Sequence, residues 1–164
     1  MKEKNSDDKQ LIVKKIDNGI VIDHIASGSS FYVLKALNID ENFPHSVFVA
    51  MNVPSKKLGR KDVLKIRNLR KDDLNLDVLG LLISGSNLVC IENYIVEHKE
   101  KIKTPKKAYG IIKCPGLSCI TNLRENVKTE FDIIESNGKK EDIKLRCVYC
   151  DKMFDIHENI SLIV

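Results

Sequence analysis

Residues 114–150 contain the cysteine motif that decides the fold of the C-terminal part of the chain, with CPGLSC at 114–119 and CVYC at 147–150. The two pairs have the spacings C-x4-C and C-x2-C, and 27 residues separate them. Two such knuckles bring four thiolates to the corners of a tetrahedron and leave no position open, which is typical of a structural zinc site. An iron–sulfur site is the lesser alternative. The predicted Zn²⁺ ligands are Cys114, Cys119, Cys147 and Cys150.

A hairpin is predicted between the two cysteine pairs. Strand-like segments at 128–135 and 142–146 flank Ser136-Asn137-Gly138, and an Asn-Gly pair favours a tight turn. These features predict a small all-β zinc ribbon whose hydrophobic core is too small to be stable alone. We therefore expect one structural zinc ion to hold the ribbon together, and its removal to unfold residues 108–164.

Upstream of the ribbon, short apolar segments alternate with turn residues between Leu11 and about Glu97. Apolar alternation predicts strands, and capping residues before a helical apolar repeat predict helices. The expected order is β–α–β–β–α–β, the split βαβ pattern of a ferredoxin-like sandwich. The expected strands are 11–13 with 20–25, 46–53, 61–66 and 87–97, and the expected helices follow Ser27-Gly28-Ser29-Ser30 and Asp72-Asp73.

The predicted fold class is therefore α+β, with a ferredoxin-like βαββαβ sandwich followed by a small all-β zinc-ribbon domain. We expect a flexible tail at 1–10, the sandwich at 11–103 and the ribbon at 104–164. The charged stretch HKEKIKTPKK at 98–107 has no apolar periodicity and is expected to link the two domains.

Composition excludes several classes of protein. The chain has 164 residues, a formal net charge of +4, 43% hydrophobic and 30% charged residues, which excludes wholesale disorder. No apolar run approaches the roughly 18–20 residues that cross a bilayer, so no membrane partner is expected. The first ten residues are polar, which predicts a cytoplasmic protein without a signal peptide. In that reducing compartment paired cysteines indicate metal binding, while the lone Cys90 is expected to be a small core residue.

One predicted strand carries two lysines on a single face. Alternation over 61–66 places Lys61, Val63 and Lys65 on one side and Leu64 and Ile66 on the other. If the apolar pair enters the core beneath the helices, both lysines lie on the open face of the sheet. Lysines on a rigid strand bind phosphate as point charges, so this face is a candidate anion site.

Nothing in the sequence indicates catalysis. Asp23 and His24 are neighbours on a predicted strand, so we expect their side chains to point to opposite faces and form no acid–base pair. Walker A and GxGxxG motifs are absent, and the cysteine-filled metal site has no open position. The residues alone thus predict a non-catalytic module with an anion-binding sheet face and a ribbon stabilised by a structural zinc ion.

At these residues the chain resembles the regulatory chain of aspartate carbamoyltransferase, from Leu11 to the C-terminus. Each motif is weak alone, but their shared order and spacing are highly specific. They are Val21-Ile-Asp-His-Ile25, Asn52-Val-Pro-Ser55, Leu58-Gly-Arg-Lys-Asp62 with Lys65-Ile66, Glu92-Asn-Tyr94, Cys114-Pro with Cys119-Ile, and Cys147-Val-Tyr-Cys150.

The resemblance implies a non-catalytic regulatory subunit in pyrimidine biosynthesis. It implies that the N-terminal domain binds CTP and ATP, that the ribbon docks on the catalytic chain, and that regulatory chains form a homodimer. The implied base- and ribose-contacting positions are Val13, Lys14, Lys15, Ile16, Asp23, Val63, Lys65, Tyr94 and Val96. The implied phosphate-contacting positions are His24 and Lys99, and Lys61 is close to them. Val89 stands where the family commonly has asparagine near the base, which predicts weaker discrimination between CTP and ATP.

Two other functions remain as alternatives. A nucleic-acid-binding zinc ribbon is favoured by the eight basic residues at 56–71, but residues 105–164 carry 10 basic and 9 acidic residues. Aromatic residues make up only 5% of the chain, which limits base stacking, so no nucleic-acid partner is expected. A small enzyme ranks last, since it lacks a nucleophile, a base and an open metal site.

Overall fold

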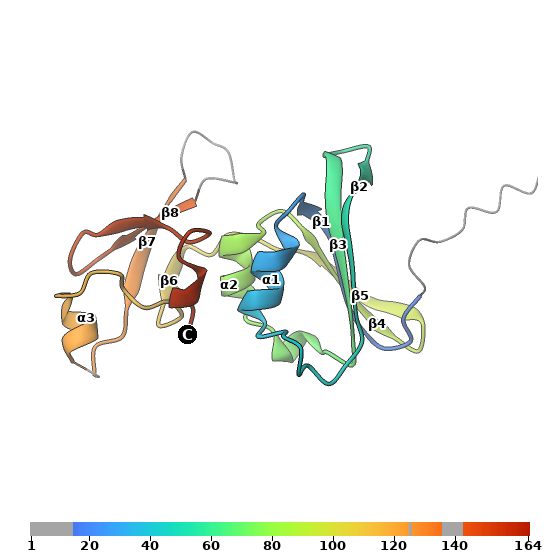
Figure 1. Ribbon diagram of the computed structural model, residues 1–164, viewed down its shortest axis with the longest axis horizontal. Coiled ribbons are helices and arrows are strands. Elements are labelled where there is room, and N and C mark those ends of the chain that lie inside the picture. The colour runs from blue at the N-terminus through green and yellow to red at the C-terminus, as the bar shows by residue number, and fades with distance from the viewer. Residues whose placement is uncertain (1–14, 125, 136–142) are drawn as a thin grey trace, which may run out of the picture.

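The structure is a computed structural model that describes residues 15–124, 126–135 and 143–164. The expected tail at 1–10, the strand at 11–13 and the hairpin turn at 136–138 lie outside these residues. Figure 1 shows two parts, with the helices α1 and α2 between the first sheet and the C-terminal ribbon. In the described part of the chain, no helix has the length or the apolar character that crossing a bilayer requires.

The described strands form two antiparallel sheets, ordered β2-β3-β1-β4-β5 and β6-β7-β8-β9. The predicted mixed α+β architecture is thereby confirmed. The first part consists of β1 (Gly19–Ala26), α1 (Ser30–Ala36), β2 (Val47–Ser55), β3 (Gly59–Arg67), the 3₁₀ helix η1 (Lys71–Asp73), α2 (Leu76–Leu82), β4 (Asn87–Glu92) and β5 (Ile95–Lys101). The second consists of β6 (Lys107–Tyr109), α3 (Ile120–Leu123), β7 (Glu130–Glu135), β8 (Ile143–Cys147), β9 (Met153–Asp155) and the 3₁₀ helix η2 (Ile160–Leu162).

The first sheet has one buried and one open face. Ile22 of β1 lies opposite Leu64 of β3 and Leu88 of β4, and all three side chains are fully buried. The neighbouring register pair, Val21 of β1 with Lys65 of β3, directs its side chains to the opposite face of the sheet, and both residues are only half-buried. The helices α1 and α2 cover the apolar face, so the sheet presents its polar face outward.

The segment at 87–97 is two strands rather than the single predicted one. β4 and β5 form a hairpin in which Glu92 lies opposite Ile95, and Asn93 and Tyr94 form its two-residue turn with φ values of 50° and 65°. Two successive positive φ values are typical of the type I′ turn that matches strand twist. Because β5 continues to Lys101 and β6 begins at Lys107, the linker predicted at 98–107 is wrong in its first four residues and in its last.

The second helix begins later than predicted. Asp72 and Asp73 belong to η1, and α2 starts after Asn75, whose side-chain oxygen accepts a hydrogen bond from the Val78 amide at 3.1 Å. Asparagine is a strong N-cap because it satisfies an amide that has no partner within the helix. The strand predicted at 46–53 also continues beyond its expected end, since β2 includes Pro54. The strand lies at the edge of the sheet, where a missing amide is tolerated.

The two parts pack directly on each other. A side chain at Gly80 of α2 would meet the Lys103 carbonyl oxygen at 2.2 Å, so glycine permits the connecting segment to approach. His157 of the ribbon places Nε2 3.0 Å from the Leu82 carbonyl oxygen, and its ring meets Tyr32 of α1 edge-on at 5.1 Å between centroids. His157 is thus half-buried at the contact between the parts.

Candidate metal centre and candidate anion-binding face

The four predicted cysteine ligands come together in the ribbon. Their Sγ atoms all lie within 4.8 Å of one another, with 3.5 Å between Cys114 and Cys150 and 3.8 Å between Cys119 and Cys147. Zinc–sulfur bonds of about 2.3 Å in a tetrahedron put sulfur atoms about 3.8 Å apart, so the cluster fits a metal of that size. Three of the cysteines are buried and Cys150 is exposed.

Hydrogen bonds to backbone carbonyl groups hold each of the two cysteine knuckles in shape. Asn122 of α3 donates from its side-chain amide to the carbonyl oxygens of Cys114 at 2.8 Å and Gly116 at 2.9 Å, which holds the first knuckle. In the second knuckle the Asp151 amide donates to the Cys147 carbonyl at 3.0 Å, and Asp151 has a φ of 55°. Neither the short helix α3 nor the role of Asn122 is marked by a pattern in the sequence.

Hydrogen bonds also reach the sulfur atoms. The Gly116 amide donates to Cys114 Sγ at 3.4 Å, and the Thr121 hydroxyl donates to Cys119 Sγ at 3.2 Å. Burial raises the pKa of Cys119, but hydrogen bonds from Thr121, Cys150 and Cys114 together outweigh burial and lower it to about 7. Such bonds stabilise and orient thiolate ligands. Four sulfurs complete a tetrahedral shell, so a bound metal would have a structural role.

The open face of the first sheet carries a row of paired residues. Strand register places Lys65 of β3 opposite Val21 of β1, Val21 opposite Val89 of β4, and Val89 opposite Lys99 of β5. The two lysines therefore flank two valines across three strand spacings, or about 14 Å of sheet. Burial lowers the pKa of Lys65. The predicted alternation of Lys61, Val63 and Lys65 away from the buried Leu64 is present in β3.

Asp23 and His24 contact each other, so the prediction that they point apart is wrong. Asp23 Oδ2 lies 2.8 Å from His24 Nδ1, and Asp23 Oδ1 accepts from Lys61 Nζ at 2.6 Å. The cause is a register shift in β1 between Ile22 and Ile25, where His24 takes a φ of 61°. A left-handed residue at a β-bulge breaks side-chain alternation.

Two residues near His24 were absent from the predicted set. Asn87, opposite Asp23 in register, places Nδ2 3.3 Å from His24 Nδ1, and the Ser86 hydroxyl donates to the His24 carbonyl at 3.3 Å. Burial raises the pKa of Asp23, but hydrogen bonds from Lys61 and the His24 amide outweigh it and hold the pKa below its ordinary value. No local motif marks Asn87, because only strand pairing brings it to this cluster.

The remaining predicted positions differ in their exposure. Lys15 is exposed, whereas Ile16 is only 3% exposed and belongs to the core, so its side chain cannot meet a ligand at the surface. Tyr94 and Val96, in the β4–β5 hairpin, are 66% and 56% exposed, so neither side chain belongs to the core. Val13 and Lys14 lie outside the described residues. Cys90 is half-buried rather than fully in the core.

The fold and the cysteine cluster define a class of two-part proteins. A mixed α+β domain is followed by a small ribbon whose four cysteines are arranged as metal ligands. Family comparison makes this specific. The model described as the aspartate carbamoyltransferase regulatory chain, allosteric domain, matches residues 11–103, and that for its metal-binding domain matches residues 106–160. The chain belongs to the aspartate carbamoyltransferase regulatory chain family, as its motifs predicted.

Similar proteins carry the same description. The aspartate carbamoyltransferase regulatory chain of Thermoplasma volcanium is 42% identical over 146 residues, covering 89% of this chain and 93% of that protein. That of Methanocella arvoryzae is 41% identical over 147 residues, covering 90% and 92%. The matched domains are allosteric and metal-binding rather than catalytic, so the chain is a regulatory subunit and not an enzyme.

Proposed function

We propose that this chain binds CTP and ATP on the open face of the first sheet and transmits the effect through its ribbon to the catalytic chain of aspartate carbamoyltransferase. The observation that carries this proposal is the clustering of Asp23, His24 and Lys61 at one end of a face that also bears Lys65 and Lys99. The family's allosteric domain covers these residues. A nucleotide that binds two quaternary states with different affinity would shift their populations.

Each group on the face has a role suited to a nucleotide. Lys65 and Lys99 supply positive charge for phosphate oxygens, and His24 is held for the same task by its contact with Asp23. The Asp23 carboxylate also accepts hydrogen bonds, as ribose hydroxyls require. The exposed Tyr94 offers a ring beside the nucleobase.

The residues proposed to contact the nucleobase include the segment before β1. Backbone groups of Lys15 and Ile16 would contact the base, together with Val63 and Val96 and with Val13 and Lys14 outside the described residues. Backbone recognition tolerates the burial of the Ile16 side chain. We also propose that the first domain is ferredoxin-like, which the element order β1, α1, β2, β3, α2, β4 supports. Its helices α1 and α2 lie on one side of the sheet and leave the other face for this contact (Figure 1).

The cysteine cluster is proposed to hold one structural Zn²⁺. Four sulfurs at tetrahedral spacing, with two hydrogen-bonded from nearby groups, suit this soft-ligand, redox-inactive ion. We propose domain bounds of 11–103 and 104–164. Measuring metal content by mass spectrometry of the purified chain should give one zinc per chain, and iron in its place would contradict the assignment.

Exposed apolar side chains around the cluster support docking on the catalytic chain. Leu117 is 93% exposed and Leu123 66%, while Val148 and Tyr149 are exposed on the second knuckle. Exposed apolar groups gathered at one place indicate a protein interface. A homodimer through the first domain and a cytoplasmic location complete the proposal. The docking test is mixing with the cognate catalytic chain, which should form a complex only with metal-loaded regulatory chain.

Calorimetric titration of CTP into the metal-loaded chain tests the nucleotide site. Lys65→Ala with Lys99→Ala should abolish the binding heat, because both positive charges of the row are lost. The matched control removes two exposed lysines elsewhere, Lys35→Ala with Lys106→Ala, and should bind like the unmodified chain. Undiminished binding by the first double variant would contradict the site.

A further inference from the structure

Three separate segments meet at Asp17 and Asn18, just before β1. The Tyr94 amide, in the β4–β5 hairpin, donates to the Asp17 carbonyl at 2.9 Å. The Asn68 amide, after β3, donates to the Asn18 carbonyl at 3.1 Å, and the Asn93 amide donates to Asn18 Oδ1 at 3.1 Å. These residues form a junction between the start of β1, the end of β3 and the hairpin.

Arg67, the last residue of β3, closes this junction with a two-pronged ion pair. Its Nε donates to Asp17 Oδ1 at 3.0 Å and its Nη2 donates to Asp17 Oδ2 at 2.7 Å. A guanidinium that donates twice to one carboxylate fixes orientation as well as distance, which lysine cannot do. The hydrogen bond from Arg67 also holds the pKa of Asp17 below its ordinary range. The pair therefore stays charged at neutral pH.

The junction sits between the two segments proposed to meet the nucleobase. Lys15 and Ile16 directly precede Asp17. Tyr94 lies in the hairpin turn, where its amide donates to the Asp17 carbonyl, and Val96 follows two residues later. Movement of Asp17 would displace both segments relative to each other. No family motif in the sequence includes Asp17 or Arg67, and their spacing of 50 residues hides the pairing.

The junction also lies at the opposite end of the face from the Asp23–His24 cluster, and the row from Lys65 to Lys99 crosses the sheet between them. Arg67 pairs in register with Gly19 at the start of β1, whereas the Asp23–His24 cluster lies four residues further along that strand. Four residues of strand span about 13 Å. A change at Arg67 should therefore affect contacts with the base more than contacts with the phosphates.

We propose that Arg67 is a positioning residue for nucleobase recognition, which holds the segment at 15–17 in a fixed place relative to Tyr94 through its bidentate pair with Asp17. This inference rests on the proposed nucleotide-binding function. Arg67 acts through Asp17 and sets the ratio of the affinities for CTP and ATP. It contributes little to the binding of the phosphate chain itself.

The test compares CTP, ATP and inorganic tripolyphosphate in calorimetric titrations of the full metal-loaded chain. Arg67→Lys keeps the charge and removes the fork, so it should change the CTP-to-ATP affinity ratio by about two- to fivefold, the range that weakening an exposed ion pair gives. Tripolyphosphate affinity should stay unchanged. Asp17→Arg with Arg67→Asp restores a two-pronged pair of reversed order and should bring the ratio back toward that of the unmodified chain.

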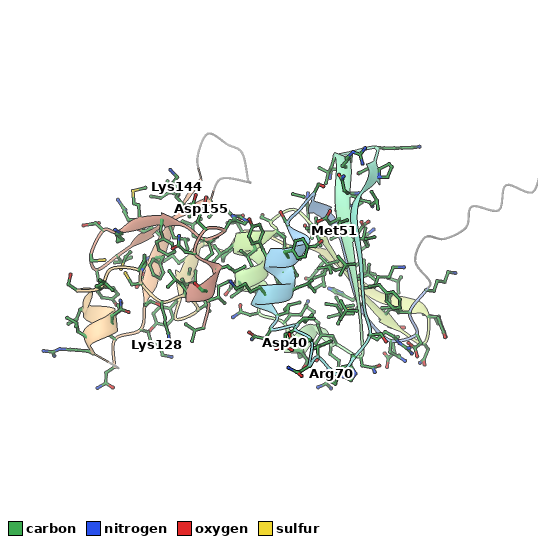
Figure 2. The ribbon with its side chains drawn as sticks, viewed as in Figure 1. Asp40, Met51, Arg70, Lys128, Lys144 and Asp155 are labelled. Carbon is green, nitrogen blue, oxygen red and sulfur yellow. The ribbon has the colours of Figure 1, made fainter. Side chains whose placement is uncertain are left out.

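The control is Arg70→Lys, at the arginine labelled in Figure 2. The Arg70 side chain is 80% exposed, and its ion pair with Asp73 is looser, at 3.8 Å. It should leave all three affinities unchanged. An Arg67→Lys chain with a lower melting temperature but an unaltered ratio would overturn the inference, because a purely structural role would do that. Absence of binding of both nucleotides to the unmodified chain would overturn the proposed function as well.

Discussion

His24 Nδ1 lies 2.8 Å from Oδ2 of the adjacent Asp23, while the other carboxylate oxygen accepts from Lys61 Nζ at 2.6 Å. One carboxylate thus holds two groups that are proposed to face phosphates. The contact leaves Nε2 as the ring nitrogen on the side away from Asp23. The arrangement makes opposite predictions for two ligands.

Replacing Asp23 with alanine should weaken CTP binding and strengthen tripolyphosphate binding. The nucleotide loses the acceptor for its ribose hydroxyls, at a cost of about tenfold in affinity. Tripolyphosphate has no ribose, and for it the removal of a nearby negative charge should outweigh the looser placement of His24 and Lys61. Parallel calorimetric titrations check both directions. A fall in both affinities would contradict a ribose-specific role for Asp23.

Asp62 should be a major determinant of stability. Its fully buried carboxylate accepts from the amides of Gly28 at 2.9 Å and Asn52 at 2.8 Å and from the Ser30 hydroxyl at 2.9 Å. Asp62→Asn turns one acceptor into a donor facing other donors, so unfolding free energy should fall by about 2–4 kcal/mol. Urea denaturation measures this loss, and the exposed Asp72→Asn is the control. An ordinary surface substitution changes the free energy of unfolding by about 0.5 kcal/mol. If the losses for Asp62→Asn and Asp72→Asn agree within that margin, Asp62 is not a major determinant of stability.

Metal removal should unfold the ribbon and leave the first sheet folded. The ribbon core is small, with Phe131 and Phe154 meeting edge-on at 5.4 Å, whereas the first domain has its own buried residues on β1, β3 and β4. Hydrogen exchange after chelation should show lost protection in β7 and β8 and retained protection in β1 and β3. Protected ribbon amides at full metal removal would contradict this prediction.

The contact between the two parts should depend on His157. Since a carbonyl oxygen only accepts, Nε2 donates to Leu82, and the ring also packs edge-on against Tyr32. His157→Ala should lower unfolding free energy by about 1–2 kcal/mol. Thermal denaturation of this variant and of the exposed His45→Ala should separate them. Equal melting temperatures would show that the contact contributes nothing.

Acid should destabilise the first domain through Asp17 and Asp23. Hydrogen bonding holds the pKa of both below the ordinary 3.8, so the folded state binds fewer protons than the unfolded state near that pH. Their stabilisation is present above about pH 4 and is lost as the pH falls through the folded values. Asp17→Asn should show a smaller loss of urea midpoint between about pH 6 and about pH 3.

Metal loss at acid pH affects both proteins in that comparison, so the difference between them isolates the Asp17 carboxyl. An identical drop in both would mean that the ion pair with Arg67 does not contribute. Because both partners lie near the surface, salt should reduce the difference.

Local patterns in the sequence were enough for the cysteine ligands and for the face of β3. The spacing from Cys114 to Cys150 predicted one cluster, because knuckles are formed by residues close in sequence. Alternation predicted that Leu64 is buried and that Lys61 and Lys65 lie opposite, because the side-chain period of a strand is two.

Contacts that depend on long-range pairing or on a left-handed residue came only from the tertiary structure. The bulge at His24 turned its ring onto Asp23, against the predicted alternation. Strand pairing brought Asn87 to that ring, and the hairpin at Tyr94 added β5 to the sheet. The sequence by itself determined the family, the ribbon and the side of β3 that bears lysines, because each follows from local spacing. The tertiary structure decided which side chains hold one another, such as Asp17 and Arg67, because those contacts join residues 50 apart.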